Sequence, residues 1–141
     1  NPSYNSFVDF LETNNKKNNI LLTTGINSFD LIDKLKNSYF SQKSEHIFFK
    51  NNSSYSIYLV FKPSFEDLES LLRNAKVLIS CHGALTHASN SFNIKKIDIF
   101  ERDKKRFYLK YTSYLKNYYP LYRSSFDLLK IDINKNLLLF N

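Results

Sequence analysis

Short apolar runs alternate along this chain with longer segments in which apolar residues recur at helical spacing. The runs at residues 20–24, 47–50, 57–62, 77–79 and 97–100 predict β-strands. Residues 29–39 and 65–75 carry apolar side chains three or four positions apart, which predicts two amphipathic helices, the first capped by Asn27. Strands that alternate with helices indicate an α/β fold, here a Rossmann-like layered domain with a mostly parallel sheet.

The first residues differ from the rest because they are polar and rich in asparagine. We interpret residues 1–19 as a linker, or as a helix that continues from an upstream domain. One Rossmann-like domain is then expected over residues 20–141. The chain begins with Asn1 and contains no methionine, so we expect it to be part of a longer protein.

The segment 77–100 carries the most specific pattern in the chain. An aliphatic strand is followed by a polar turn at 80–83, a helix over 84–92 and a second strand over 97–100. A strand–helix–strand unit of this length predicts two parallel strands. Ligands bind such sheets at the carboxyl ends of the strands, where this turn lies and where a helix opens with unpaired N–H groups. We therefore predict a phosphate-binding site at the turn.

The segment 104–123 is basic and aromatic. Five of its residues share one face at helical spacing: Phe107, Tyr111, Tyr114, Leu115 and Tyr118. This spacing predicts a buried helix face that ends at Pro120, and truncating a ring there would cost on the order of 3 kcal/mol. If the rings were exposed instead, they could stack on nucleic-acid bases. Separately, the outward lysines and Arg123 could contact anionic lipid headgroups or a phosphorylated glycan. We favour core packing. A short helix or an extended segment is expected over 125–134.

The charge and the cysteine content limit which partners and which compartment we expect for this protein. The formal net charge of +7 and the pI near 9.4 favour phosphates, nucleic acid or an anionic membrane surface as partners, or reflect a solvated lysine-rich surface. A single cysteine excludes an internal disulfide and a cysteine zinc cluster, and it fits a reducing compartment. The sequence has neither a signal-type N-terminus nor an apolar run of about 20 residues, so we expect a cytoplasmic protein.

The polar turn supplies the side chains with reactive groups. Two histidines, His82 and His87, lie close together in it, which favours a ligand-facing role for at least one of them. Cys81 has no group predicted to orient it as a nucleophile, so we expect a small, partly buried thiol. The histidines lack the ligand spacing of a metal motif, and no metal is predicted.

Residues 68–101 resemble the helix, strand and signature turn of family 9 glycosyltransferases, the heptosyltransferase-like enzymes. Gly83 aligns with the glycine of that family's turn. His87 follows it by four residues where the family usually has three, and Cys81 stands where the family has an acid. The His-Gly-Ala triplet also looks like the turn of other GT-B transferases, so the resemblance extends to that superfamily.

The resemblance implies the C-terminal, donor-binding half of a GT-B enzyme, which consists of two Rossmann-like domains. Gly83 would let the backbone approach a diphosphate, while N–H groups and side chains around it donate hydrogen bonds. Glu101 would accept from ribose or sugar hydroxyls. The implied binding residues are Thr24, Gly25, Ser80, Cys81, His82, Gly83, Ala84, Leu85, Thr86, His87 and Glu101.

The expected reaction is sugar transfer from a nucleotide-sugar donor to a glycan or lipid-linked saccharide. The reaction requires no cofactor, because the nucleotide-sugar is a substrate. Peripheral contact of the protein with an anionic membrane is compatible with this reaction. The resemblance places the general base on the upstream half, so no catalytic residue is assigned and no nucleic-acid partner is expected. Two alternatives stay open, a nucleic-acid-binding module and a non-catalytic α/β interaction domain.

Overall fold

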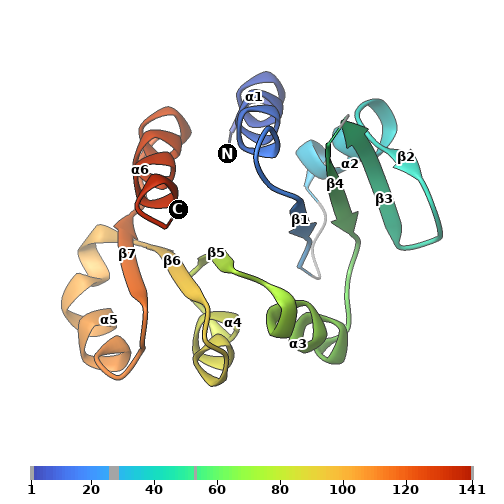
Figure 1. The fold of residues 1–141 in the computed structure, drawn as a ribbon. Helices are drawn as coiled ribbons and strands as arrows, with labels where there is room; N and C mark the ends of the chain where they lie inside the picture. Colours follow the sequence, from blue (N-terminus) through green and yellow to red (C-terminus); the bar gives the residue numbers. More distant parts are fainter. Residues whose placement is uncertain (1, 26–28, 53, 141) are drawn as a thin grey trace. The chain divides into compact units, whose positions relative to one another are not determined.

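The computed structural model describes residues 2–25, 29–52 and 54–140, and it divides the chain into two compact units (Figure 1). The units are Asn1–Phe65 and Glu66–Asn141. Both are α/β: the first contains a mixed four-stranded sheet and the second an all-parallel three-stranded sheet. The predicted fold class is therefore confirmed, although the chain divides after residue 65 and not after residue 19. The helix cap predicted at Asn27 lies outside the described residues.

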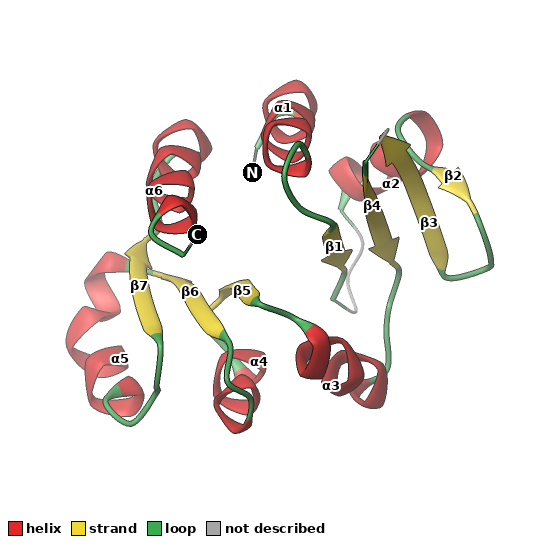
Figure 2. Ribbon diagram, viewed as in Figure 1, coloured by secondary structure: helices red, strands yellow, loops and turns green. Residues whose placement is uncertain are grey.

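Among its described residues, the first unit contains two helices and four strands, which Figure 2 colours by type. In chain order they are α1 Tyr4–Asn15, β1 Ile20–Thr23, α2 Asp30–Ser38, β2 Ser41–Gln42, β3 Ile47–Asn52 and β4 Tyr55–Val60. The strand order is β1-β4-β3-β2, with β1 parallel to β4 and the other pairs antiparallel. The predicted strands at 20–24, 47–50 and 57–62 are all present. The short edge strand β2 was not predicted.

Helix α1 is an integral part of the first unit. Leu11 is fully buried in a core that also contains Leu35 of α2 and Ile57 of β4. On the same helix, Glu12 accepts hydrogen bonds from Lys50 at 2.7 Å and from the Tyr39 hydroxyl at 3.1 Å. The segment interpreted as a linker or an upstream helix is thus a helix, and its apolar residues are part of the core of this unit.

The second unit consists of parallel strands and the helices that connect them. Its elements are α3 Phe65–Asn74, β5 Val77–Cys81, α4 Ala84–Ala88, the 3-10 turn η1 Ser89–Ser91, β6 Lys95–Phe100, the 3-10 turn η2 Arg102–Lys104, α5 Lys105–Thr112, β7 Tyr118–Tyr122 and α6 Phe126–Leu138. The strand order is β5-β6-β7. The predicted strand–helix–strand unit is confirmed, because β5 and β6 are parallel neighbours connected through α4.

The two faces of this parallel sheet differ in polarity. Ser80, Asp98 and Pro120 are register partners, so they lie on the same face, and α4 and α5 cover it. The opposite face is apolar and packs against α6, which buries Leu129 and Ile133. The central strand β6 therefore has an aliphatic side and a polar side, and the polar side carries the candidate site.

The predicted helix over 107–118 is wrong in its second half. Helix α5 ends at Thr112, and Asn117 takes a left-handed conformation (φ 50°) immediately before the strand β7. Pro120 lies within β7 and does not end a helix. This is tolerated because β7 is the last strand in the sheet order and needs no ladder N–H on its outer side.

The predicted burial of the aromatic face is also wrong. Phe107, Tyr111 and Tyr114 are 59%, 48% and 56% exposed, whereas Leu115 is buried. A helix of eight residues covers only a small part of the sheet, and its inward positions are taken by Tyr108 and Thr112. The expected cost of truncating Tyr111 or Tyr114 therefore falls from about 3 kcal/mol to the small value typical of surface sites.

Candidate functional site

A small pocket opens where all three parallel strands of the second unit end. Cys81 and Phe100 are the last residues of β5 and β6, while His82, Glu101 and Arg123 follow β5, β6 and β7. These five side chains line it together with Ile99 and Tyr108. Its volume is about 100 Å³. The carboxyl edge of a parallel sheet is where open α/β folds bind their ligands, so this pocket is the candidate site.

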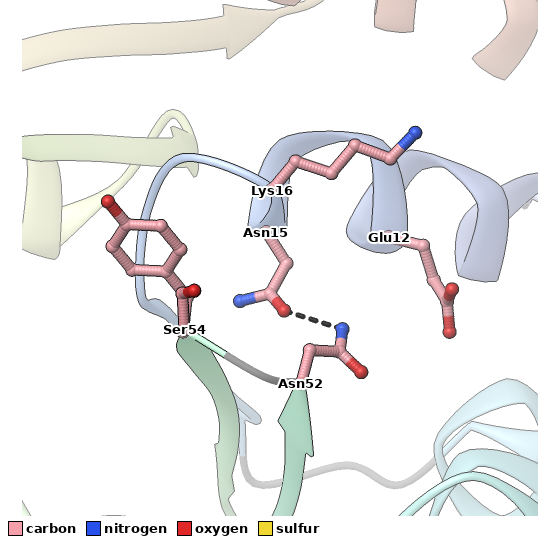
Figure 3. A pocket seen from close by; sticks show the side chains of 6 residues that line it. Glu12, Asn15, Lys16, Asn52 and Ser54 are labelled. Atoms are coloured by element: carbon pink, nitrogen blue, oxygen red, sulfur yellow. Dashed lines mark hydrogen bonds between the residues drawn. The ribbon is translucent and has the colours of Figure 1, made fainter.

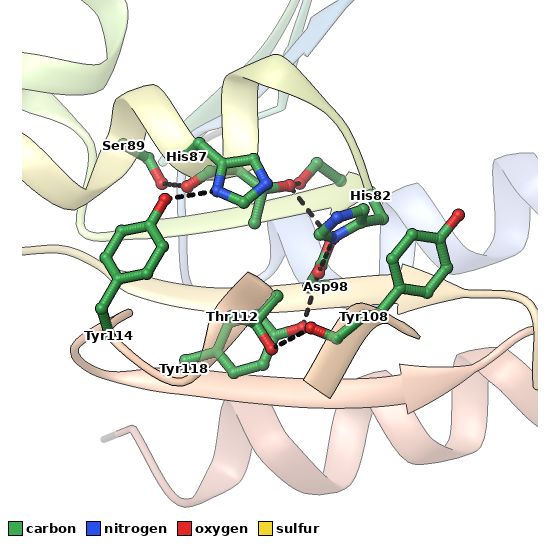
Figure 4. Close-up of polar contacts among 10 residues, drawn as sticks. His82, His87, Ser89, Asp98, Tyr108, Thr112, Tyr114 and Tyr118 are labelled. Atoms are coloured by element: carbon green, nitrogen blue, oxygen red, sulfur yellow. Dashed lines mark hydrogen bonds and ion pairs between the residues drawn. The ribbon is translucent and has the colours of Figure 1, made fainter. Parts of the chain in front are cut away.

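A buried carboxylate organises the floor beneath this pocket (Figure 4). Asp98 is fully buried. One of its oxygens lies 2.6 Å from Nδ1 of His82 and accepts from the Tyr118 hydroxyl at 2.7 Å. Its other oxygen accepts from the Thr86 hydroxyl at 3.0 Å, and that hydroxyl also lies 3.2 Å from the Ser80 hydroxyl. Three donors from three elements therefore converge on a single acid.

The other contacts of Asp98 assign the tautomer of His82. Both oxygens of Asp98 accept from hydroxyls, those of Thr86 and Tyr118, so we place the proton of the third contact on Nδ1 of His82, which donates it to the acid. Nε2 is then the ring nitrogen that remains for a ligand. The ring itself is held in place by the face of Tyr108, whose centroid lies 4.2 Å away. His82 is thus fixed in position, and the His82 side chain is 10% exposed.

His87 lies beside this network and is oriented from a different direction. Its ring is edge-on to that of His82, with centroids 5.2 Å apart, and its Nδ1 lies 2.6 Å from the Tyr114 hydroxyl. The two predicted histidines are therefore neighbours in space. Each has a dedicated partner, Asp98 for one and Tyr114 for the other.

The charged side chains at the rim of the pocket are more exposed than the histidines. Arg123 and Glu101 form an ion pair of 2.8 Å, with side chains 58% and 44% exposed. An exposed pair of this kind contributes little to stability, so Arg123 can exchange its partner for an anionic ligand at small cost. Away from the pocket, near the amino end of β6, burial lowers the pKa of Lys96, whose ammonium donates to the carbonyls of Ile94 and Lys116.

The residues implied by the resemblance are distributed over three environments. Cys81, His82 and Glu101 line the pocket. Ser80 and Thr86 belong to the buried network, and Thr86 is fully buried, so its hydroxyl is directed to Asp98. Gly83, Ala84, Leu85 and His87 form the turn and first residues of α4, while Thr24 and Gly25 belong to the first unit, where Thr24 accepts from the amide of Lys62.

Three details of the turn differ from expectation. Gly83 has φ 173°, an extended conformation open to any residue, and a Cβ there would meet only the Cys81 carbonyl at 3.9 Å. Helix α4 spans five residues and continues as η1, so it is shorter than the predicted helix over 84–92. Cys81 is exposed, not partly buried. Attraction for an anion therefore rests on Arg123 more than on the helix terminus.

The sequence interpretation missed the residue at the centre of the site. Asp98 lies between Ile97 and Ile99 in a strand that is otherwise buried, and an acid at such a position needs hydrogen-bonding partners nearby. That pattern was the available signal. Tyr118 carried no comparable signal, because its spacing suggested helix packing, and Tyr108 was not part of any predicted pattern.

A second, larger pocket lies in the first unit (Figure 3). It has a volume of about 360 Å³ and is lined by Glu12, Asn15, Lys16, Asn52, Ser54 and Tyr55. Asn15 accepts a hydrogen bond from Asn52 at 2.7 Å across it. It lies where β4 begins, at the amino end of the parallel pair β1 and β4, which is opposite to the edge where α/β sheets bind ligands.

Comparison of the chain with protein-family models, curated proteins and solved structures gives no match. Within residues 2–25, 29–52 and 54–140, no group of three His, Cys, Asp or Glu side chains is arranged to hold a metal ion. In the same residues, none of the helices has the length and apolar character needed to cross a membrane.

The half-buried Tyr118 of the network makes stability depend on pH in the alkaline range. Burial, followed by the hydrogen bond to Asp98, raises the pKa of Tyr118 above its ordinary value. The unfolded chain then loses this proton from about pH 10 while the folded chain keeps it, so stability is present below that pH and falls above it. The slope is about 1.4 kcal/mol per pH unit for one such group.

We expect Tyr118→Phe to reduce this alkaline slope in urea-unfolding curves recorded between about pH 9 and pH 11. Tyr39→Phe provides the matched comparison in the first unit, because burial also raises the pKa of Tyr39. An unchanged slope in Tyr118→Phe would show that the Tyr118 hydroxyl is accessible to solvent in the folded chain.

Proposed function

We propose that this chain is the donor-binding part of a GT-B glycosyltransferase, as its resemblance to family 9 enzymes implies. The observation that carries the proposal is the pocket at the carboxyl ends of three parallel strands, with a cation at its rim and an oriented histidine at its base. Such an edge suits a nucleotide, and cationic or donor groups suit its diphosphate. The donor is a nucleotide-sugar, and the acceptor is a glycan or lipid-linked hydroxyl in the cytoplasm.

The chemistry assigned to these residues is stabilisation of the leaving group. In the transfer, the acceptor oxygen forms a bond to the anomeric carbon as the bond from that carbon to the diphosphate breaks, and negative charge grows on the diphosphate. Arg123 would lie where it could neutralise that charge, and Asp98 holds the His82 ring beside it in the same pocket. The general base is not assigned to any residue of this chain.

Gly83→Val tests the proposal through ligand affinity. The glycine backbone is extended, and an added Cβ meets no close neighbour, so the variant should fold with nearly unchanged stability. If the turn contacts a diphosphate, the branched side chain should weaken binding at least about tenfold, or 1.4 kcal/mol. Calorimetric titration with UDP, ADP, GDP and CMP measures this, and Gly83→Ala should show an intermediate loss.

Equal affinity in the wild type and in a folded Gly83→Val variant would remove the turn from the site. A second comparison uses Arg123→Gln with Arg106→Gln as its control, since both arginines are exposed and only Arg123 lines the pocket. The proposal requires a loss of nucleotide affinity in Arg123→Gln alone.

A further inference from the structure

A cluster of basic and aromatic side chains covers the outward side of α5 and the turn after it. We call it the basic–aromatic surface and define it by Lys105, Arg106, Phe107, Lys110, Tyr111 and Tyr114, all of which are exposed. Residues 102–116 contain six basic side chains and a single acid, Asp103. The net positive charge of the chain is therefore concentrated in this segment.

The basic side chains of this surface are not neutralised within the protein. In the described part of the chain, Lys105, Arg106 and Lys110 form no ion pair with a carboxylate. The ammonium of Lys105 lies 5.4 Å from the ring centroid of Tyr122, and that of Lys110 lies 5.9 Å from that of Tyr111. The exposed rings indicate an apolar contact and the unpaired cations an anionic one, so a partner for this surface should be both anionic and apolar.

The geometry of the rings distinguishes between two anionic partners. Phe107 and Tyr111 pack against each other with centroids 4.6 Å apart and planes tilted by 46°, while Tyr114 is tied to His87 through its hydroxyl. A strand of nucleic acid needs separated ring faces on which successive bases stack. Rings that pack against each other beside lysines are instead suited to the interface of a bilayer, where aromatic residues insert and cations contact the headgroups.

We propose that the basic–aromatic surface binds peripherally to an anionic lipid membrane. This binding does not depend on the proposed transferase activity, and it requires no nucleotide. It would, however, bring the candidate site close to the membrane, because Tyr108 on the inward side of the same helix packs on His82. A lipid-linked acceptor would then be presented next to the pocket.

Vesicle flotation tests this surface without any nucleotide. The wild-type chain should float with phosphatidylcholine vesicles that contain about one third phosphatidylglycerol, and not with pure phosphatidylcholine, and added salt should weaken binding. Each basic residue near such a surface contributes roughly fivefold in affinity, so Lys105→Glu/Lys110→Glu should lose at least about tenfold. The control Lys17→Glu/Lys34→Glu makes the same charge change at exposed sites of the first unit and should retain binding.

Phe107→Ser tests the apolar part of the interaction against Phe29→Ser, since the two rings are 59% and 58% exposed. Only Phe107→Ser should weaken binding, and both variants should keep the wild-type circular dichroism. Two results would overturn the proposal. One is an equal loss of vesicle binding in the two charge variants. The other is that the chain does not bind vesicles but binds single-stranded RNA, and that Phe107→Ser abolishes the RNA binding. An absence of nucleotide binding would not affect the prediction of membrane binding, so the two proposals are tested independently.

Discussion

Replacing Asp98 with alanine should lower the free energy of unfolding by about 3–5 kcal/mol, the range found when one partner of a buried ion pair is removed. The carboxylate is fully buried and accepts from His82, Tyr118 and Thr86. Alanine leaves these donors without their acceptor in a site that water cannot readily reach, and the unsatisfied groups bear the cost of desolvation. Urea-induced unfolding followed by circular dichroism measures the change.

Two further variants separate the acid's role in the network from simple loss of volume. Asp98→Asn keeps the size of the side chain but replaces one of the two accepting oxygens with an NH₂ group, so it should also destabilise the chain. Tyr118→Phe removes one donor and leaves the acid with two, and it should cost only about 1 kcal/mol. If Asp98→Asn were as stable as the wild type, the network would not depend on a charged acceptor.

Leu11→Ala should destabilise the first unit by about 2–5 kcal/mol, the range typical for a leucine truncated in a closed core. Leu11 is fully buried among Leu35, Ile57 and Leu59, which come from α2 and β4. The truncation leaves a cavity between the helix and the sheet that these neighbours fill only in part. Hydrogen exchange of the β4 amides and urea unfolding both measure the effect.

Thr13→Ala is the control, because Thr13 is on the same helix and exposed. It should change stability by less than about 0.5 kcal/mol. Similar small effects of both substitutions would mean that α1 is detached from the sheet, as the linker interpretation of residues 1–19 assumed.

The strands and their alternation with helices could be predicted because apolar periodicity reports burial directly. Ile20–Thr23, Val77–Cys81 and Lys95–Phe100 each begin with or contain runs of β-branched and aliphatic residues, and each is a strand in a parallel pair. The strand–helix–strand unit around Gly83 also follows from local signals, since the short connection allows few arrangements.

The segment after Glu101 could not be predicted in the same way because two signals conflicted. The spacing of Phe107, Tyr111 and Tyr114 is helical, but a helical face is buried only where another element covers it, and none of the three is buried. The order of strands in the sheet explains why Pro120 lies within a strand. As the last strand in the order, β7 accepts a proline that would end a helix.

Three of the predicted site residues line the pocket at the carboxyl edge of the sheet, but the predicted set did not contain Asp98 or Tyr118. His82 and Glu101 follow strands, so their position at the carboxyl edge could be inferred from the chain order. Asp98 and Tyr118 lie within strands on one face, and their meeting depends on the register of β6 against β7. No local pattern fixes that register, so the network emerged only from the three-dimensional arrangement.

The most direct test of the central claim is an NMR titration of the chain with UDP, ADP and GDP, following backbone amides and the His82 ring nitrogens. We predict shifts at residues 80–86, at Arg123 and at Nε2 of His82, with no change around Asn15 and Asn52 in the larger pocket of the first unit. If none of the nucleotides perturbs residues 80–88 at millimolar concentration in a folded chain, or if the shifts are confined to the first unit's pocket, the assignment of a donor site at the carboxyl edge is contradicted.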